Sequence, residues 1–116
     1  MRHMAEKITL GLTEDVTIIS HGKRRKVKAC IDTGATKSSL DSRLASELGL
    51  GPIVNSKLVR NAHGNTLRPV VLCDIEISGR RIRAEFTLAD REEMNYKMLI
   101  GQNVLTLGFL IDPGKG

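Results

Sequence analysis

Short apolar stretches with alternating side chains, each bounded by a turn, recur along this chain and restrict the folds open to it. The clearest covers residues 25–31, where Val27, Ala29 and Ile31 would share one face of a strand. Polar turn segments at 20–23 and 78–80 indicate hairpins, and in the second of these Ile75 and Ile77 would face one side. These patterns predict a mainly β fold. The other stretches with strand character are 8–12, 16–19, 58–60, 67–73, 74–77, 82–88, 98–101 and 109–111.

Only residues 41–49 have clear helical periodicity. Leu40, Leu44 and Leu48 recur every four residues, and Asp41 or Ser39 can cap the start. A second short helical piece is predicted at 102–107. Aromatic residues make up only 3% of the chain and there are eleven glycines, which suits an aliphatic core with many tight turns. A small closed barrel with one or two short helices is the economical architecture.

A length of 116 residues fits a single domain, which we place at residues 8–113. Residues 1–7 are expected to be disordered or left over from cloning, because the chain opens with Met1-Arg2-His3-Met4, and 114–116 form a tail. No signal peptide or membrane-spanning segment is visible, so a cytoplasmic location is expected and no membrane partner.

The formal net charge of +5 is concentrated in a basic run over residues 23–28. Such a run is either the footprint of an acidic partner or a solvated strand and turn, and the second interpretation is favoured because such runs usually face solvent. Nucleic-acid binding is disfavoured because the potential stacking aromatics, Phe86, Tyr96 and Phe109, are widely spaced.

The triplet Asp32-Thr33-Gly34 is the strongest candidate for chemistry. It follows the predicted strand directly and is followed by Ala35 and small hydroxylated residues, which would let two such loops approach closely. The triplet occurs once, so chemistry that needs two carboxylates would take the second from another copy of the chain. The plainer interpretation is a turn residue that caps its own backbone.

With these features the chain resembles the retropepsins, the single-lobed aspartic proteases that work as homodimers. Their pattern is an apolar residue with Asp-Thr-Gly-Ala, a glycine-bearing flap hairpin, and two apolar residues with Gly before a short helix, here Leu99-Ile100-Gly101. Residues 87–101 with 110–113 resemble more narrowly the cytoplasmic bacterial and archaeal group that is linked to ribosomal-protein glutamate ligases and labelled "ATP-dependent zinc protease". That group usually has arginine where this chain has Gln102, a change expected not to touch the catalytic motif.

The resemblance implies a retropepsin-like barrel and an aspartic endopeptidase. Two copies of Asp32 would share one proton and activate a water between them, while Thr33 joins the two loops across the dimer. Gly34 would leave its N–H free to approach the carboxylate, and Ala35 would support the loop. The proposed flap, which would contact the substrate, contains Asn61, Ala62, His63, Gly64 and Asn65.

Several other residues receive structural interpretations. Gly101 is expected to serve a close crossing of the backbone. Asp112 lies in a near echo of the catalytic triplet, but Pro113 removes the hydroxyl and the N–H, so Asp112 is expected to form a turn. Cys30 and Cys73 lie in apolar stretches and are expected to be buried free thiols. No cofactor is expected: the three histidines lack metal-ligand spacing and no phosphate-binding loop is present.

The substrate is expected to be a peptide or protein. Arg60, His63 and Arg68 flank or occupy the flap, so an acidic, glutamate-rich peptide is electrostatically suited. Two alternatives remain open: a catalytically silent retropepsin-like domain that binds peptides, and a basic β-barrel that binds nucleic acid.

Overall fold

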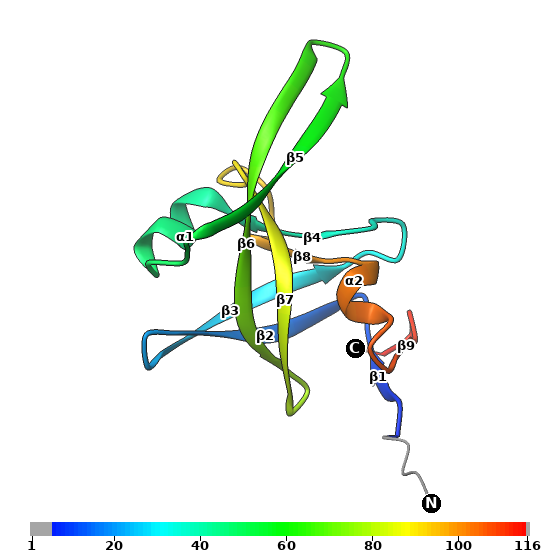
Figure 1. Ribbon diagram of the computed structural model, residues 1–116. Coiled ribbons are helices and arrows are strands. Elements are labelled where there is room, and N and C mark those ends of the chain that lie inside the picture. Colours follow the sequence, from blue (N-terminus) through cyan, green and yellow to red (C-terminus); the bar gives the residue numbers. More distant parts are fainter. Residues whose placement is uncertain (1–5, 116) are drawn as a thin grey trace, which may run out of the picture.

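Strands dominate residues 6–115, the part of the chain that the computed structural model describes (Figure 1). Residues 1–5, which make up most of the N-terminal segment expected to be disordered or left over from cloning, and Gly116 lie outside the described residues. The elements in chain order are β1 (Ile8–Leu10), β2 (Thr13–Ser20), β3 (Lys23–Ile31), β4 (Ser38–Asp41), α1 (Ser42–Glu47), β5 (Ile53–Asn61), β6 (Gly64–Ile77), β7 (Arg80–Ala89), β8 (Met98–Ile100), α2 (Gln102–Leu105) and β9 (Phe109–Ile111).

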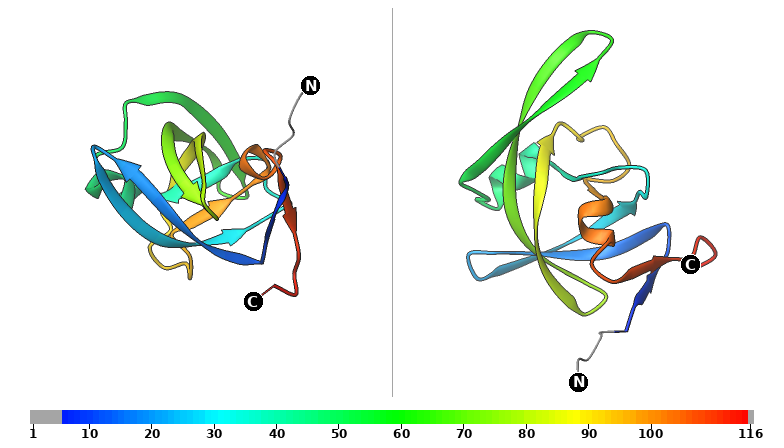
Figure 2. Two further views of the ribbon diagram at one scale, coloured as in Figure 1. Left: turned by 90° about the horizontal axis from the view of Figure 1, so that it is seen from below. Right: turned by 45° about the vertical axis from the view of Figure 1, so that its right-hand side comes forward.

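Six of these strands close into a barrel. Their order is β2-β3-β8-β4-β7-β6, and an antiparallel pairing of β2 with β6 joins the two ends. β5 pairs with β6 alone, and β1 lies parallel to β9 in a separate two-stranded sheet beside the barrel (Figure 2). The predicted mainly β class, the closed barrel and the short helices are confirmed.

Two tight hairpin turns lie where the sequence indicates them. His21 and Gly22 join β2 to β3 with φ angles of 51° and 75°, and Ser78 and Gly79 join β6 to β7 with φ angles of 48° and 79°. Positive φ at both central residues matches the right-handed twist of the flanking strands.

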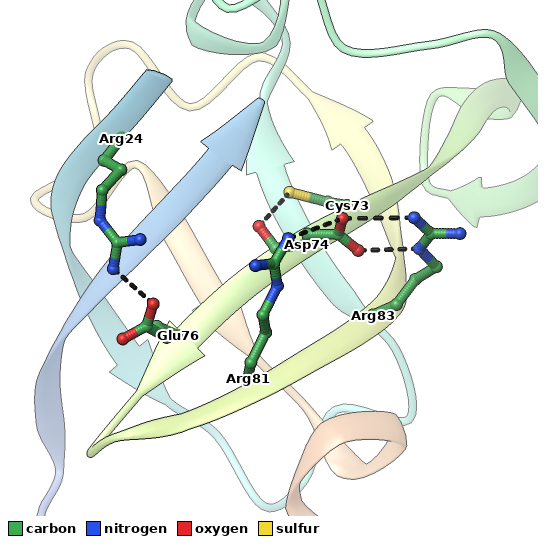
Figure 3. Close-up of polar contacts among 6 residues, drawn as sticks. All are labelled: Arg24, Cys73, Asp74, Glu76, Arg81 and Arg83. Atoms are coloured by element: carbon green, nitrogen blue, oxygen red, sulfur yellow. Dashed lines mark hydrogen bonds and ion pairs between the residues drawn. The ribbon is translucent and has the colours of Figure 1, made fainter. Parts of the chain in front are cut away.

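The two faces of β6 separate apolar from charged residues as predicted. Ile75 and Ile77 are fully buried in the barrel, whereas Asp74 and Glu76 point outward. Asp74 accepts from Arg83 Nε at 2.8 Å and Arg81 approaches it at 3.6 Å, while Glu76 pairs with Arg24 (Figure 3). The core itself is aliphatic apart from Phe86 and Phe109, as the composition implies.

Two elements differ from the sequence expectation. β6 is one strand of fourteen residues, where a break was expected between residues 73 and 74; its first half pairs with β5 and its second half belongs to the barrel. Residues 38–41 form β4, so Leu40 belongs to a strand and not to the helix. α1 then begins at Ser42, where Asp41 is the N-cap and accepts from the Leu44 N–H at 3.1 Å.

The basic run forms most of β3 and is solvent-exposed except for Val27, which is half-buried. Arg24 pairs with Glu76, and Arg25 lies 3.7 Å from Glu47. This environment agrees with the solvated interpretation of the run.

Neither helix within residues 6–115 has the length and apolar character needed to cross a bilayer.

Candidate active site

The loop that carries Asp32 begins where β3 ends. The Asp32 N–H donates to the Ile100 carbonyl at 2.9 Å, which ties the start of the loop to β8. The Gly34 N–H donates to Asp32 Oδ1, also at 2.9 Å, and so orients the carboxylate. Asp32 is half-buried, whereas Thr33 and Gly34 are exposed. Asp32 therefore sits at an open edge of the barrel, where its backbone is tied to β8 and its carboxylate is oriented by Gly34.

The start of α2 holds the second half of this loop. The N–H groups of Gln102 and Asn103 donate to the carbonyls of Ala35 and Thr36, at 2.8 and 3.2 Å. The Gln102 side chain also donates from Nε2 to the Thr33 carbonyl at 2.8 Å. The expectation that this glutamine does not touch the catalytic motif was wrong, because the side chain reaches back over the exposed loop.

A buried polar cluster lies behind the loop and was not predicted. Ser38 is fully buried; its Oγ donates to Asn103 Oδ1 at 2.8 Å and accepts from the Gly101 N–H at 2.9 Å. Asn103 Nδ2 donates in turn to the Glu85 carbonyl on β7. The cluster connects β4, β7, β8 and α2. The alternation of Ser38 with Leu40, which is also buried, is the only sequence signal that pointed to it.

Gly101 lies where two backbone segments cross. A Cβ at this position would stand 2.5 Å from the Lys37 carbonyl oxygen and 2.8 Å from that of Ala35, closer than carbon and oxygen can approach. The residue thus occupies a close crossing directly behind the catalytic loop, as the sequence analysis expected of it.

The predicted flap is the hairpin of β5 and β6. Asn61 pairs with Gly64 across a turn formed by Ala62 and His63, and residues 62–65 are exposed. The side chain of Asn61 lies outside the described residues. The hairpin projects well beyond the barrel (Figures 1 and 2), and residues 62–65 at its tip are exposed to solvent.

Two adjacent hollows lie between the base of this hairpin and the barrel. One hollow, of about 320 Å³, is lined by Thr36 and Lys37 and by residues of β5 and β7. The other, of about 220 Å³, reaches Arg68 and Arg91. Lys37, Lys57 and Thr87 line both. Asp32 lines neither hollow.

Arg91 and Asp41 fasten the loop after β7 to the barrel, and neither role was predicted. Asp41 accepts from the Arg91 N–H at 2.8 Å as well as from Leu44. Burial by itself would raise the pKa of Asp41, but these two N–H groups, with Lys97 and Arg43, lower it below its usual value. The Arg91 guanidinium donates to the Tyr96 carbonyl and to Ser39 Oγ, and burial lowers its pKa.

The remaining candidates have structural environments. Burial raises the pKa of the Cys73 thiol to about 12, so it is a core residue, and Cys30 is half-buried. Asp112 accepts from the Gly114 N–H at 2.9 Å in an exposed turn after β9. Within residues 6–115 no group of three His, Cys, Asp or Glu side chains is arranged to hold a metal ion.

Comparison with known families decides how this geometry is classified. Residues 45–116 match the RimB-like family, described as the retropepsin-like aspartic endopeptidase RimB. The chain belongs to this family. The matched region starts after the Asp-Thr-Gly triplet and contains the β5–β6 hairpin, Gly101 and α2.

Two curated proteins match part of the chain. The chain is 27% identical over 63 residues to a probable alpha-L-glutamate ligase of Desulfotalea psychrophila and 32% identical over 84 residues to Protein DDI1 homolog 1 of Caenorhabditis elegans. These matches cover 53% and 68% of the chain but only 14% and 21% of the relatives.

Three solved structures share the fold. A Legionella pneumophila protein of unknown function matches with a TM-score of 0.67 at 19% identity, over 93% of this chain and 95% of that one. Simian foamy virus (mac) protease matches with a TM-score of 0.62 at 20% identity, over 81% and 91% of the two chains. EIAV protease bound to the inhibitor HBY-793 matches with a TM-score of 0.63 at 20% identity, over 91% of each chain. The retropepsin-like fold is thereby confirmed.

Proposed function

We propose that this chain is an aspartic endopeptidase that works as a homodimer, with Asp32 of each subunit forming one catalytic pair. The observation that carries the proposal is the position of Asp32: a half-buried carboxylate at an open edge of the barrel, oriented by the Gly34 N–H and backed by Ile100. One such carboxylate is half of an acid–base site, and the exposed Thr33 and Gly34 leave the edge accessible to a second copy.

The chemistry follows from two carboxylates that face each other. Like charges so close cannot both ionise, so the pair holds one proton. The ionised Asp32 takes a proton from a water between the two, and the water attacks the substrate carbonyl carbon. The protonated Asp32 donates to the carbonyl oxygen, which gives a tetrahedral intermediate with two hydroxyl groups. The Asp32 that took the water's proton then gives it to the amide nitrogen while the other Asp32 takes back a hydroxyl proton, so the C–N bond breaks and an acid and an amine leave as two peptides.

The other site residues have supporting roles. Thr33 would meet its counterpart across the two-fold axis, while Gly34 and Ala35 keep the loop small enough for the two copies to meet. Residues 61–65 would close over the substrate and exclude water, as flaps do in other enzymes. Gly101 allows the crossing behind the loop. The domain that carries all of them spans residues 8–113.

An acidic peptide is the substrate that the charges favour. Lys37, Lys57, Arg68 and Arg91 line the hollows under the flap, against a single carboxylate there, Glu85. The curated relative named as a probable glutamate ligase also supports glutamate-rich substrates. We place the enzyme in the cytoplasm.

Replacement of Asp32 tests the proposal. Asp32→Asn keeps the size and the Gly34 contact but removes the acid–base group, so the rate of peptide cleavage should fall by about 10²–10⁴-fold. Asp112→Asn is the matched control, because that carboxylate accepts from Gly114 in the same way. It should retain wild-type activity.

A catalytically silent peptide-binding domain would behave differently. The wild-type chain would then cleave no peptide, and Asp32→Asn would bind a glutamate-rich peptide as tightly as the wild type does. Equal activity of the Asp32→Asn and Asp112→Asn variants would also refute the proposal.

A further inference from the structure

The hollow of about 220 Å³ under the flap is lined by four cationic side chains and no carboxylate. Lys57, Arg68 and Arg91 all line it. The fourth cation there, Lys37, lies 3.6 Å from Glu85, but within residues 6–115 no ion pair involves any of the other three. Lys57 and Arg68 therefore border the hollow without an ion pair in this part of the chain, whereas Asp41 attracts the Arg91 guanidinium.

Arg68 has an unmet hydrogen-bonding requirement. Its Nε is buried, and it is the only buried side-chain nitrogen or oxygen among the described residues without a partner. An unsatisfied buried donor costs about 1–3 kcal/mol, and more when it is charged. Native structures rarely leave such a group without a ligand or an ordered water.

Arg91 borders the hollow from the barrel side, and none of its buried nitrogens lacks a partner. The residue is only 9% exposed, yet its guanidinium donates to two neutral oxygens, those of the Tyr96 backbone and the Ser39 hydroxyl. A guanidinium carries five N–H donors, so several remain available. Asp41 already attracts this guanidinium, and a carboxylate in the hollow would add a direct charge-assisted hydrogen bond.

The flap and the barrel contribute opposite walls of the hollow. Lys57 and Arg68 are direct partners across β5 and β6, a position in which like charges repel. Arg91 follows β7 on the barrel side. Without an anion, repulsion among the three cations disfavours a closer approach of the hairpin to the barrel. With an anion between them, the same cations draw the walls together.

We propose that a carboxylate bound by Lys57 and Arg68 of the flap and Arg91 of the barrel holds the flap closed. Carboxylate binding itself does not depend on the proposed peptidase function. The inference rests on that function only for what closure achieves, which is to enclose the substrate. The volume is several times the roughly 30 Å³ that one water occupies in the liquid. It can therefore admit a glutamate side chain of a bound peptide, or a small free carboxylate.

The test uses full-length, isotope-labelled Asp32→Asn protein, so that binding is measured without cleavage. Sodium acetate is titrated against sodium chloride at equal ionic strength, and a hexaglutamate peptide against hexaglutamine. The expected result is a saturable NMR shift of the Arg68 Nε–H and of the Arg91 amide with acetate and with hexaglutamate. Residues 62–65 should become more ordered only when the carboxylate binds. Tight hexaglutamate binding with weak acetate binding would identify a peptide side chain as the source of the carboxylate. Similar affinities for hexaglutamate and acetate would identify a free anion.

Substitutions then locate the effect. Arg68→Gln and Lys57→Gln should each weaken carboxylate binding about tenfold or more, the usual loss for a charge-assisted hydrogen bond. Lys26→Gln is the matched control, because it removes the same charge from the exposed face of β3. It should leave the carboxylate affinity within about twofold.

Two results would overturn the proposal: shifts that chloride reproduces at equal ionic strength, or equal losses in Lys26→Gln and Arg68→Gln. Failure of the peptidase function would look different. The wild-type protein would then cleave neither peptide, while carboxylate binding and flap ordering would persist in Asp32→Asn.

Discussion

At the scale of single residues, the catalytic carboxylate and its supports differ in how visible they are in the sequence. Asp32 and Gly34 form a short motif, and the contact between them follows from their spacing of two residues. Ser38 and Asn103 are just as important to the loop, yet their contacts join residues 65 positions apart. Nothing local in the chain marks such partners, so they could be found only in the fold.

Protonation of Asp41 is expected to reduce stability. Its carboxylate accepts two buried N–H groups, from Leu44 and Arg91, and its pKa is lowered. Asp41→Ala should reduce the free energy of unfolding at pH 7 by about 2 kcal/mol, as measured by urea denaturation.

The pH dependence of that loss follows from the sign of the shift. Because the folded state holds the Asp41 proton less tightly than the unfolded state, the contribution is complete above the unfolded pKa of about 3.9. It disappears as the pH falls through the lower pKa of the folded state. Wild type and Asp41→Ala should therefore converge in stability in acid; a difference that stays constant from pH 7 to pH 2 would contradict this role.

At the scale of elements, the sequence predicts what depends on local pattern and misses what depends on distant partners. The hairpin turns, α1 and β8 lie where turn residues and periodicity place them. β4 was missed because its four residues begin with two serines and pair with β7 and β8, which lie far along the chain. The sequence predicts two strands in place of the continuous β6, because β6 belongs to two hairpins, one with β5 and one with β7.

The crossing of α2 behind the catalytic loop makes a specific prediction about Gly101. A methyl group there would collide with the carbonyls of Lys37 and Ala35, and neither can move without displacing the loop. Gly101→Ala should lower the free energy of unfolding by about 1–3 kcal/mol, as overpacking does, and reduce cleavage further. Urea denaturation and a peptide-cleavage assay measure the two effects.

Gln102→Ala provides the comparison for that variant. It removes one exposed side-chain contact to Thr33 and should cost only about 1 kcal/mol or less. Equal stability of Gly101→Ala and the wild type would show that the crossing tolerates a side chain, and the assigned role of Gly101 would be wrong.

At the scale of the whole molecule, the barrel is complete within one chain and the proposed active site is not. Pairing of β2 with β6 closes the barrel, and β1 with β9 joins the two ends of the described chain. The resemblance of the sequence to the retropepsins predicts this fold. The direction in which the flap projects and the grouping of cations beneath it depend on contacts between distant parts of the chain, so the sequence does not predict them. Each chain supplies one Asp-Thr-Gly triplet, at an exposed edge.

The most direct test of the central claim is the cleavage rate per chain over a dilution series, with the oligomeric state measured by sedimentation at each concentration. Two chains that share one active site predict a constant rate where dimers dominate, and a rate per chain that falls in proportion to the dimer fraction on further dilution. A rate per chain that stays constant while the protein sediments as a monomer would contradict the account.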